Sequence, residues 1–225
     1  MKIISYSLWG NRKLYTQGAI ACGIESKEIF PEWKTNIAVH KDVSEDTVSE
    51  LKDIFDIVKI YDDDASEYRG LFWRFDAMMY DGMEACLFRD TDSRPSDKEF
   101  QAVQEWLRSD KQIHNMRDNI HHYAPIMGGL WGIKKEGPIN VSFFYRLIMA
   151  HNLGEYGCDQ RILWRMYKGR SDQVLSHDDS LRYNSVKFPP HKPLEQGAFL
   201  GDCICMDGET NKKYGREKFD RRRKK

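Results

Sequence analysis

The stretch Glu84–Arg94 reads EACLFRDTDSR and places two carboxylates, Asp90 and Asp92, directly after a short apolar run. Residues 84–88 have the length and composition of a buried β-strand, since apolar and aromatic residues favour strands. In open parallel α/β sheets, ligands bind at the carboxyl ends of the strands. The two carboxylates therefore lie where a ligand site is expected.

Short strand-like runs alternate with helical patterns along the rest of the chain, which is typical of an α/β fold. β-branched and aromatic residues mark the strands, while capping residues, glycine and proline mark helix ends. We expect further strands at 3–8, 35–39, 55–60, 128–133 and 198–206, helices at 44–54, 71–79, 96–107, 138–150 and 159–166, and polar loops after the last helix.

The size and composition of the chain indicate one globular domain. It has 225 residues, 40% of them apolar and 31% charged, and no run approaches the roughly 18 apolar residues that span a bilayer. The N-terminal residues 1–7 read as a strand rather than as a signal peptide. We therefore expect a single domain over 1–210 that works in the cytosol, where its five cysteines stay reduced.

The charges balance over the whole chain and are uneven within it. Lys plus Arg and Asp plus Glu each number 35, so no overall charge attracts nucleic acid, and we expect no nucleic-acid partner. Residues 211–225 are strongly basic. We expect them to form a flexible, solvated tail, with weak contact to a membrane surface or nucleic acid as the alternative.

Two carboxylates one residue apart in a turn can bind one hard cation, directly or through water. Mg²⁺ or Mn²⁺ held by Asp90 and Asp92 would bridge diphosphate oxygens and neutralise charge on a departing nucleoside diphosphate. Arg89 and Arg94 flank the pair, and arginine matches phosphate oxygens well. The pair alone is weak support, because acidic residues are also common in solvated loops.

Three segments together resemble a known family. Residues 88–94, 71–75 and 126–132 are similar to those of small GT-A-fold glycosyltransferases found in large algal viruses and in bacteria, and the resemblance extends over most of 1–205. It implies a GT-A-like, Rossmann-like domain with a mixed, mostly parallel sheet flanked by helices. It also implies a sugar-nucleotide donor, a uridine one being favoured, a divalent metal, and a glycan or other hydroxyl acceptor.

The resemblance also suggests donor-binding residues. In such enzymes the first strand and its loop hold the nucleoside, which corresponds here to residues 5–10, including Ser7 and Trp9. Trp9 is also the best candidate for base stacking because it follows a strand. The motif formed by Asp90, Thr91 and Asp92 would hold the metal and the diphosphate.

Further candidates lie near the reacting sugar and the acceptor. By the resemblance, Asp159 and Gln160 lie beside the reacting sugar, and His177 would be a third metal ligand, although a solvated loop explains His177 equally well. Arg74 sits between aromatic residues, so either a phosphate contact or a buried ion pair is expected. Asp118 either caps a turn or contacts the acceptor.

Two other functions remain open from the sequence. An apolar strand ending in two spaced aspartates also occurs in haloacid-dehalogenase-like phosphohydrolases, in which the first aspartate attacks phosphorus. That motif usually follows the first strand, whereas three strands are expected before Asp90. A sugar-binding module without catalysis is the other alternative.

Overall fold

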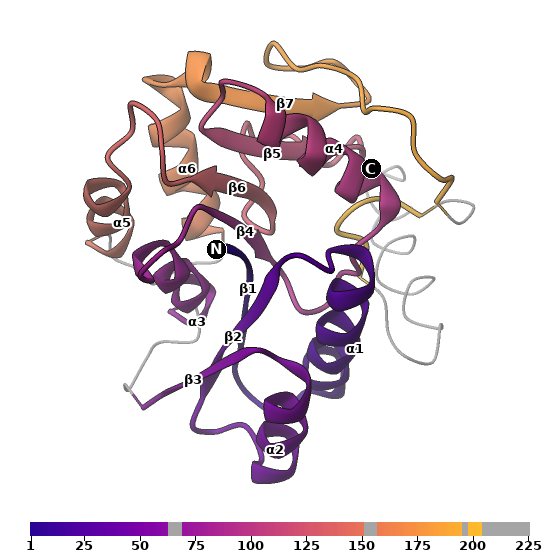
Figure 1. The fold of residues 1–225 in the computed structure, drawn as a ribbon, viewed down its shortest axis with the longest axis vertical. Helices are drawn as coiled ribbons and strands as arrows, with labels where there is room; N and C mark the ends of the chain where they lie inside the picture. Colours follow the sequence, from indigo (N-terminus) through magenta and orange to yellow (C-terminus); the bar gives the residue numbers. More distant parts are fainter. Residues whose placement is uncertain (63–68, 151–156, 195–197, 204–225) are drawn as a thin grey trace, which may run out of the picture.

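A seven-stranded sheet forms the centre of the protein (Figure 1). The computed structural model describes residues 1–62, 69–150, 157–194 and 198–203. The sheet has the order β3-β2-β1-β4-β6-β5-β7. Its strands are β1 Lys2–Leu8, β2 Lys34–His40, β3 Ile57–Tyr61, β4 Ala85–Arg89, β5 Ile113–Arg117, β6 Leu130–Lys134 and β7 Val174–Asp178.

Strand direction gathers most strand ends at one edge. Strands β3, β2, β1 and β4 are parallel. Strand β6 runs against β4 and β5, and β7 is parallel to β5. All strands except β6 therefore end at the same edge of the sheet, which we call the C-terminal edge.

Helices cover both faces of the sheet. They are α1 Lys13–Ile29, α2 Glu45–Ile54, α3 Gly70–Trp73, η1 Arg74–Met79, α4 Asp97–Arg108, α5 Val141–Met149, α6 Cys158–Lys168 and η2 Ser171–Gln173. One core contains residues of α1, α2 and α4, and the other contains residues of α3, η1, α5 and α6; Figure 1 shows these two groups on opposite sides of the sheet. Strand β4 supplies both cores: Ala85 and Leu87 pack on one face, and Cys86 and Phe88 on the other.

Local capping signals agree with the observed helix starts. The side chain of Ser44 caps α2, and that of Ser96 caps α4 by accepting from the Glu99 amide. Asn140 does the same for α5, one residue before its first helical residue. These helix starts confirm the sequence predictions to within a few residues.

The expected helix over 71–79 is divided into α3 and the 3-10 helix η1. Two buried serines of β1 fix the start of η1: Ser7 Oγ accepts from the Arg74 amide at 2.9 Å, and Ser5 Oγ donates to the Arg74 carbonyl at 2.7 Å. The sequence pattern does not contain these long-range contacts. The third strand begins at Ile57 rather than at residue 55.

The expected late strand over 198–206 is wrong for its described part. Residues 198–203 form a loop with a single β-bridge, between Cys203 and Ser93, and residues 204–206 lie outside the described residues, as does the basic tail 211–225. Strands β5 and β7 were not expected, because their buried positions include many polar residues. These are His114, Asn115, Arg117, Ser176, His177 and Asp178.

No helix in the described ranges is both long and apolar enough to cross a membrane.

Candidate active site

One buried guanidinium joins two of the predicted carboxylates. Arg74 is 2% exposed. Its Nη1 donates to Asp90 Oδ1 and, at 3.1 Å, to the Arg89 carbonyl, and its Nη2 pairs with Asp159 Oδ2 at 3.1 Å. The structure thus brings together Arg74 of η1, Asp90 after β4 and Asp159 in the first turn of α6.

Two glycines make room for these carboxylates. A Cβ added at Gly129 would lie 2.0 Å from Asp90 Oδ2, and one added at Gly128 would lie 2.2 Å from Asp159 Oδ2. Both distances are shorter than any real contact. The glycine pair before β6 is therefore part of the site, and its sequence signal was the close backbone approach that adjacent glycines allow.

The charges of this group depend on one another. Burial acts to lower the pKa of Arg74, but Asp90 and Asp159 outweigh it and the pKa is raised. Burial raises the pKa of Asp159, while the Arg74 guanidinium opposes the rise. Arg74 therefore stays charged and keeps a nearly buried carboxylate paired.

The donor set of the Asp90 turn suits a divalent cation. Burial, and next the charge of Asp90, raise the pKa of Asp92 to about 6. The Asp90 side chain remains 46% exposed although it is paired with Arg74. Two adjacent carboxylates that repel each other, one of them accessible, are a fitting place for Mg²⁺ or Mn²⁺. Within the described ranges, no three His, Cys, Asp or Glu side chains gather as a complete metal site.

His177 does not join this pair. It lies on β7, and the strand order places β6 and β5 between β7 and β4, a separation of about 14 Å at the usual strand spacing. The ring is buried and its Nδ1 shares a hydrogen bond with His114 Nε2 at 3.0 Å. The geometry therefore contradicts the expected third metal ligand.

The turn that carries the carboxylates is anchored to α1. Thr91 is buried, and a Cβ at Gly18 would lie 2.1 Å from its carbonyl oxygen. The thiol of Cys22 donates to the Ser93 carbonyl at 2.9 Å. Helix α1 thus packs closely on the turn, so Thr91 has a structural part whatever else it contacts.

The two flanking arginines face the protein rather than a ligand. Arg89 is 2% exposed and its Nε donates to Glu99 at 2.5 Å. Arg94 Nη1 donates to the Gly18 carbonyl at 3.3 Å, and its Nε lies 3.5 Å from Glu25. The expected phosphate contact of Arg89 is therefore wrong, because the guanidinium forms a buried ion pair with α4.

Aromatic residues gather at the ends of β1, β2 and β3. The ring of Trp73 stacks with His40 at 5.3 Å and with Tyr61 at 4.9 Å, and meets Trp9 edge-on at 6.5 Å. Trp9 keeps intermediate exposure, whereas Ser7 is buried and holds the Arg74 amide. Trp9 remains a candidate for base stacking, and Ser7 serves to position Arg74.

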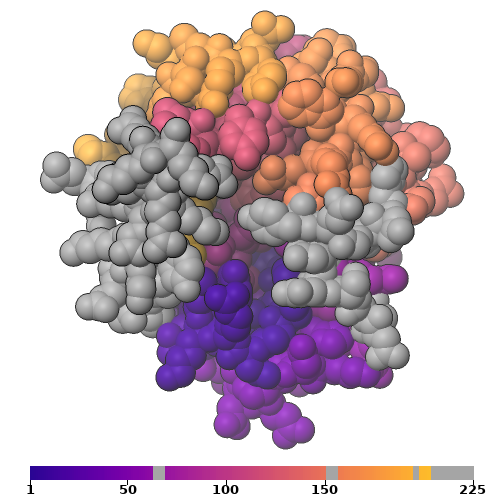
Figure 2. All heavy atoms as spheres, turned by 180° about the vertical axis from the view of Figure 1, so that it is seen from behind, coloured from indigo at the N-terminus to yellow at the C-terminus, as the bar shows by residue number. Residues whose placement is uncertain are grey.

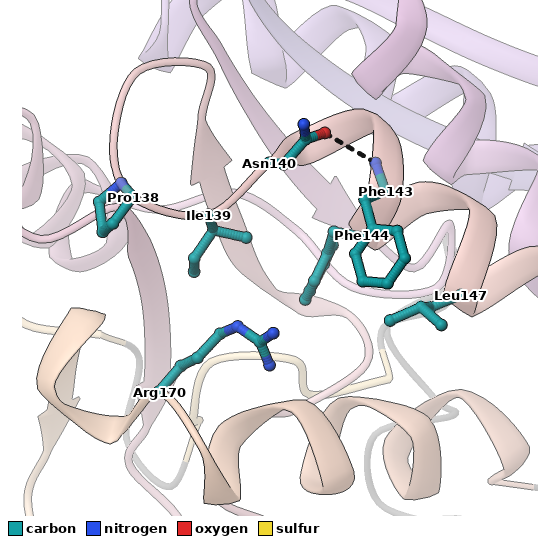
Figure 3. Close-up of a pocket in the computed structure, with 7 residues that line it drawn as sticks. All are labelled: Pro138, Ile139, Asn140, Phe143, Phe144, Leu147 and Arg170. Atoms are coloured by element: carbon teal, nitrogen blue, oxygen red, sulfur yellow. Dashed lines mark hydrogen bonds between the residues drawn. The ribbon is translucent and has the colours of Figure 1, made fainter.

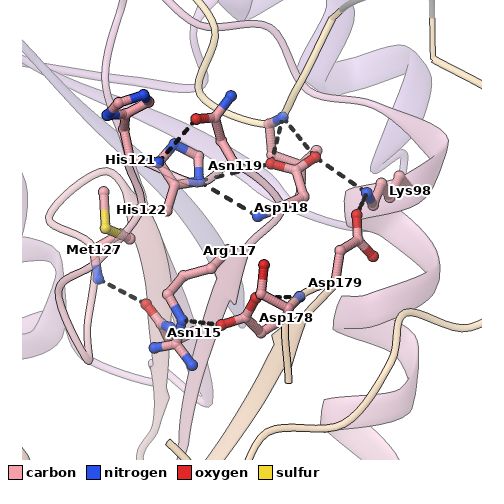
Figure 4. A network of polar contacts seen from close by, with 12 residues as sticks. Lys98, Asn115, Arg117, Asp118, Asn119, His121, His122, Met127, Asp178 and Asp179 are labelled. Carbon is pink, nitrogen blue, oxygen red and sulfur yellow. Dashed lines mark hydrogen bonds and ion pairs between the residues drawn. The ribbon is translucent and has the colours of Figure 1, made fainter. Parts of the chain in front are cut away.

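Asp118 lies in a polar network with its side chain enclosed (Figure 4). It accepts from Lys98 Nζ at 3.1 Å and from the Leu200 amide at 2.9 and 3.0 Å, and the side chain is only 2% exposed. Burial raises the pKa of Asp118, and the Leu200 amide and Lys98 oppose the rise. The expected acceptor contact is wrong in this arrangement, because Asp118 joins β5 to α4 and to the loop at Leu200.

A cavity of about 230 Å³ lies elsewhere, between the start of α5 and the loop before η2 (Figure 3). Its lining includes Ile139, Phe143 and Arg170. Residues 138–140 follow the carboxyl end of β6, and β6 runs against β4. The cavity is therefore at the opposite edge of the sheet, and none of the candidate residues lines it.

No protein-family model matches the chain, and no curated protein matches it. Solved structures do. A glycosyltransferase involved in glycosylation of the major capsid of PBCV-1 is 13% identical, with a TM-score of 0.50 over 79% of this chain and 80% of that one. Glucosyl-3-phosphoglycerate synthase from Mycobacterium tuberculosis, with Mg²⁺ and uridine diphosphate, is 10% identical, with a TM-score of 0.52 over 87% and 73%.

A second structure of that synthase contains Mn²⁺, uridine-diphosphate-glucose and glycerol 3-phosphate, and it is 10% identical, with a TM-score of 0.51 over 87% and 74%. At such low identity these similarities establish the fold alone. The chain has the fold of these glycosyltransferases, which confirms the GT-A-like fold predicted from the sequence.

Proposed function

We propose that this chain is a metal-dependent glycosyltransferase that moves a sugar from a nucleoside diphosphate, a uridine one being favoured, to a hydroxyl group of an acceptor. The observation that carries the proposal is the group formed by Arg74, Asp90 and Asp159 at the C-terminal edge. It combines an accessible carboxylate after β4 with a second, buried carboxylate at a helix start. The synthase of the same fold forms a complex with Mn²⁺ and uridine-diphosphate-glucose.

Asp90 and Asp92 would hold Mg²⁺ or Mn²⁺ against the donor diphosphate. When bound, the ion supplies positive charge to the leaving nucleoside diphosphate. Arg74 keeps Asp90 in place through its buried guanidinium. Diphosphate oxygens and water would complete the coordination, because the described residues offer only this pair of carboxylates.

Asp159 and Gln160 would act on the sugar side of the donor. Asp159 is 5% exposed and accepts from the Gln160 amide at 2.8 Å. A carboxylate held between Arg74 and the start of α6 can orient an acceptor hydroxyl or stabilise positive charge at the anomeric carbon. Gln160 is partly exposed and follows in the first turn of the same helix.

The nucleoside would bind near Trp9, on the other side of the Asp90 turn from α6. Trp9 follows β1 and meets Trp73, the last residue of α3, which stacks with His40 and Tyr61 at the ends of β2 and β3. Indole rings offer a flat, apolar face on which a base can stack. A donor would then extend from Trp9 across Asp90 to Asp159.

Nucleotide release from a panel of nucleotide sugars tests the proposal. With Mn²⁺, the wild type should release nucleoside diphosphate from one donor, faster with acceptors than without, and chelation should stop the release. Release of inorganic phosphate from sugar phosphates would instead support the phosphohydrolase. Saturable binding of a donor with no turnover under any condition would leave a sugar-binding module and overturn the enzyme assignment.

A further inference from the structure

Three aromatic side chains are exposed on neighbouring segments of the second half of the chain. Tyr123 is 66% exposed, Trp164 38% and Tyr183 38%. Large aromatic side chains are mostly buried in proteins, so a group of exposed ones marks a binding surface more often than an isolated one does. We call these three residues the aromatic platform.

Direct contacts join the three segments into one surface. The rings of Trp164 and Tyr183 lie 6.3 Å apart at 83°. The hydroxyl of Tyr183 donates to the Tyr123 carbonyl at 2.7 Å. In Figure 2 the segment near residue 120 (pink) lies between α6 (orange) and the loop after β7 (lighter orange).

A buried arginine holds the two loops that carry Tyr123 and Tyr183. Arg117 is 0% exposed; its Nε pairs with Asp178 at 2.9 Å, and its Nη2 donates to the Arg182 carbonyl at 3.0 Å. Arg182 in turn donates to the Asn119 carbonyl at 3.1 Å. These contacts hold the two loops in place. Binding a ligand to their aromatic side chains therefore costs little further conformational entropy.

The backbone of the second loop adopts an unusual conformation. Leu181, Tyr183 and Asn184 have φ values of 53°, 56° and 55°. Residues other than glycine rarely adopt the left-handed region, and such strain is concentrated at functional sites. Three such residues within four positions indicate that the conformation of this loop serves a function rather than stability.

The platform lies beyond Asp159 as seen from the nucleoside side. The two loops follow β5 and β7, which end at the C-terminal edge together with β4. Trp164 belongs to α6, the helix whose first turn contains Asp159. The aromatic cluster of Trp9 and Trp73 lies at the other end of the strand order, with β1 to β3. A donor bound as proposed leaves the platform on its acceptor side.

The helix of the platform, α6, carries more basic than acidic residues. The exposed residues of α6 include Arg161, Arg165 and Lys168, and Lys168 lies over the Trp164 ring at 5.9 Å. The one acidic residue of α6, Asp159, is buried and paired with Arg74. An acceptor that meets this surface is therefore favoured if it carries negative charge.

We propose that the aromatic platform binds the acceptor, and that the acceptor is an oligosaccharide with acidic groups. Sugar rings present flat C–H faces that stack on aromatic rings. A small phosphorylated acid would not reach across three aromatic residues. This inference rests on the proposed transferase for its role, but the binding itself can be measured without turnover.

Binding to an array of oligosaccharides tests the inference. The probes are galacturonic acid trimers and neutral glucose trimers. Binding to each is measured for the wild type and for the variants Tyr123→Ala, Trp164→Ala and Tyr123→Phe. We expect the acidic trimers to bind better, each alanine variant to weaken binding about fivefold or more, and Tyr123→Phe to stay near the wild type. Phe143→Ala is the matched control, because Phe143 is also exposed, at 49%, and lies on α5 by the distant cavity.

Three results would overturn the inference: no binding of acidic trimers by the wild type, equal or better binding of neutral ones, or alanine variants that bind as the wild type does. Circular dichroism of each variant excludes loss of fold as a cause. Nucleotide release from donors is measured separately, with and without acceptors. Its absence under every condition would contradict the proposed transferase, and the array would then test the aromatic platform alone.

Discussion

Two buried arginines at the same edge of the sheet, Arg74 and Arg117, show how similar chemistry serves two purposes. Each side chain is at most 2% exposed and pairs with aspartate. The partner of Arg117, Asp178, is fully buried. Of the partners of Arg74, Asp159 is nearly buried, whereas the Asp90 side chain is 46% exposed.

The pKa values reflect this difference. Burial lowers the pKa of Arg117 despite its pairing with Asp178, with Arg182 adding to the effect. At Arg74 burial acts in the same direction, but Asp90 and Asp159 reverse it. An excess of carboxylates around Arg74 is thus available to a ligand, while Arg117 and Asp178 are fully used in holding loops. Both groups contain a buried ion pair, so the accessible carboxylate of Asp90 is what distinguishes the candidate active site (the Arg74 group) from the loop scaffold (the Arg117 group).

The largest expected effect is on stability, in the Arg117 group. Arg117→Met should lower the free energy of unfolding by about 3–5 kcal/mol, because it leaves Asp178 buried without its main partner. Urea unfolding followed by circular dichroism measures the change. The matched variant Asp90→Asn should cost less than about 1 kcal/mol, since Asp90 is half exposed and Asp159 still pairs with Arg74. Equal losses in the two variants would refute the distinction between site and scaffold.

The next effect is on turnover. Asp159→Ala should lower kcat on the order of a hundredfold and change the KM for the donor little, since it removes a charge that acts mainly in the transition state. Steady-state nucleotide release with saturating Mn²⁺ separates the two constants. A variant with a raised donor KM and normal kcat would make Asp159 a binding residue.

The loop scaffold should also respond to pH through His122. Burial, and next Arg182 and Arg117, lower the pKa of His122 from 6.5 to about 4. The folded state therefore favours neutral His122, so its contribution is complete above pH 6.5 and is lost as pH falls toward 4. Between pH 7 and pH 4 the wild type should lose about 3 kcal/mol relative to His122→Gln. Parallel curves of unfolding free energy against pH for the wild type and His122→Gln would show that His122 does not cause the loss. His191→Gln is the control.

The smallest expected effect concerns the room made for Asp90. Gly129→Ala should lower turnover about tenfold, because the added methyl group would lie 2.0 Å from Asp90 Oδ2 and the carboxylate would have to move by about 1 Å. Gly169→Ala is the control, since nothing lies within 4 Å of a Cβ at that position. Equal activity of the two variants would show that Asp90 tolerates displacement.

The sequence predicted the fold class, the first four strands and the turn with Asp90 and Asp92, because alternating patterns and capping residues are local signals. It did not predict β5 and β7, since buried polar residues such as His114 and His177 conceal a strand when only hydrophobic patterns are read. Reading only hydrophobic patterns also explains the wrong prediction that His177 is a metal ligand. Whether a polar residue faces a ligand or a buried partner is decided by tertiary contacts.

The pairing of Arg74 with Asp90 and Asp159 spans 16 and 85 positions of the chain. The sequence left Arg74 open between a phosphate contact and a buried ion pair, and the structure shows the ion pair. Local patterns and the resemblance therefore named Arg74, Asp90 and Asp159 as candidates but did not predict their arrangement.

Titration of Mn²⁺ in the presence of uridine diphosphate, followed by electron paramagnetic resonance, tests the central claim most directly. The account predicts that the wild type binds the ion, and that Asp90→Asn and Asp92→Asn each weaken binding tenfold or more, because each removes one of two charged ligands. His177→Ala should bind as the wild type does, since its ring is buried against His114. Binding curves of the two aspartate variants that superimpose on the wild type would contradict the assignment of the metal site.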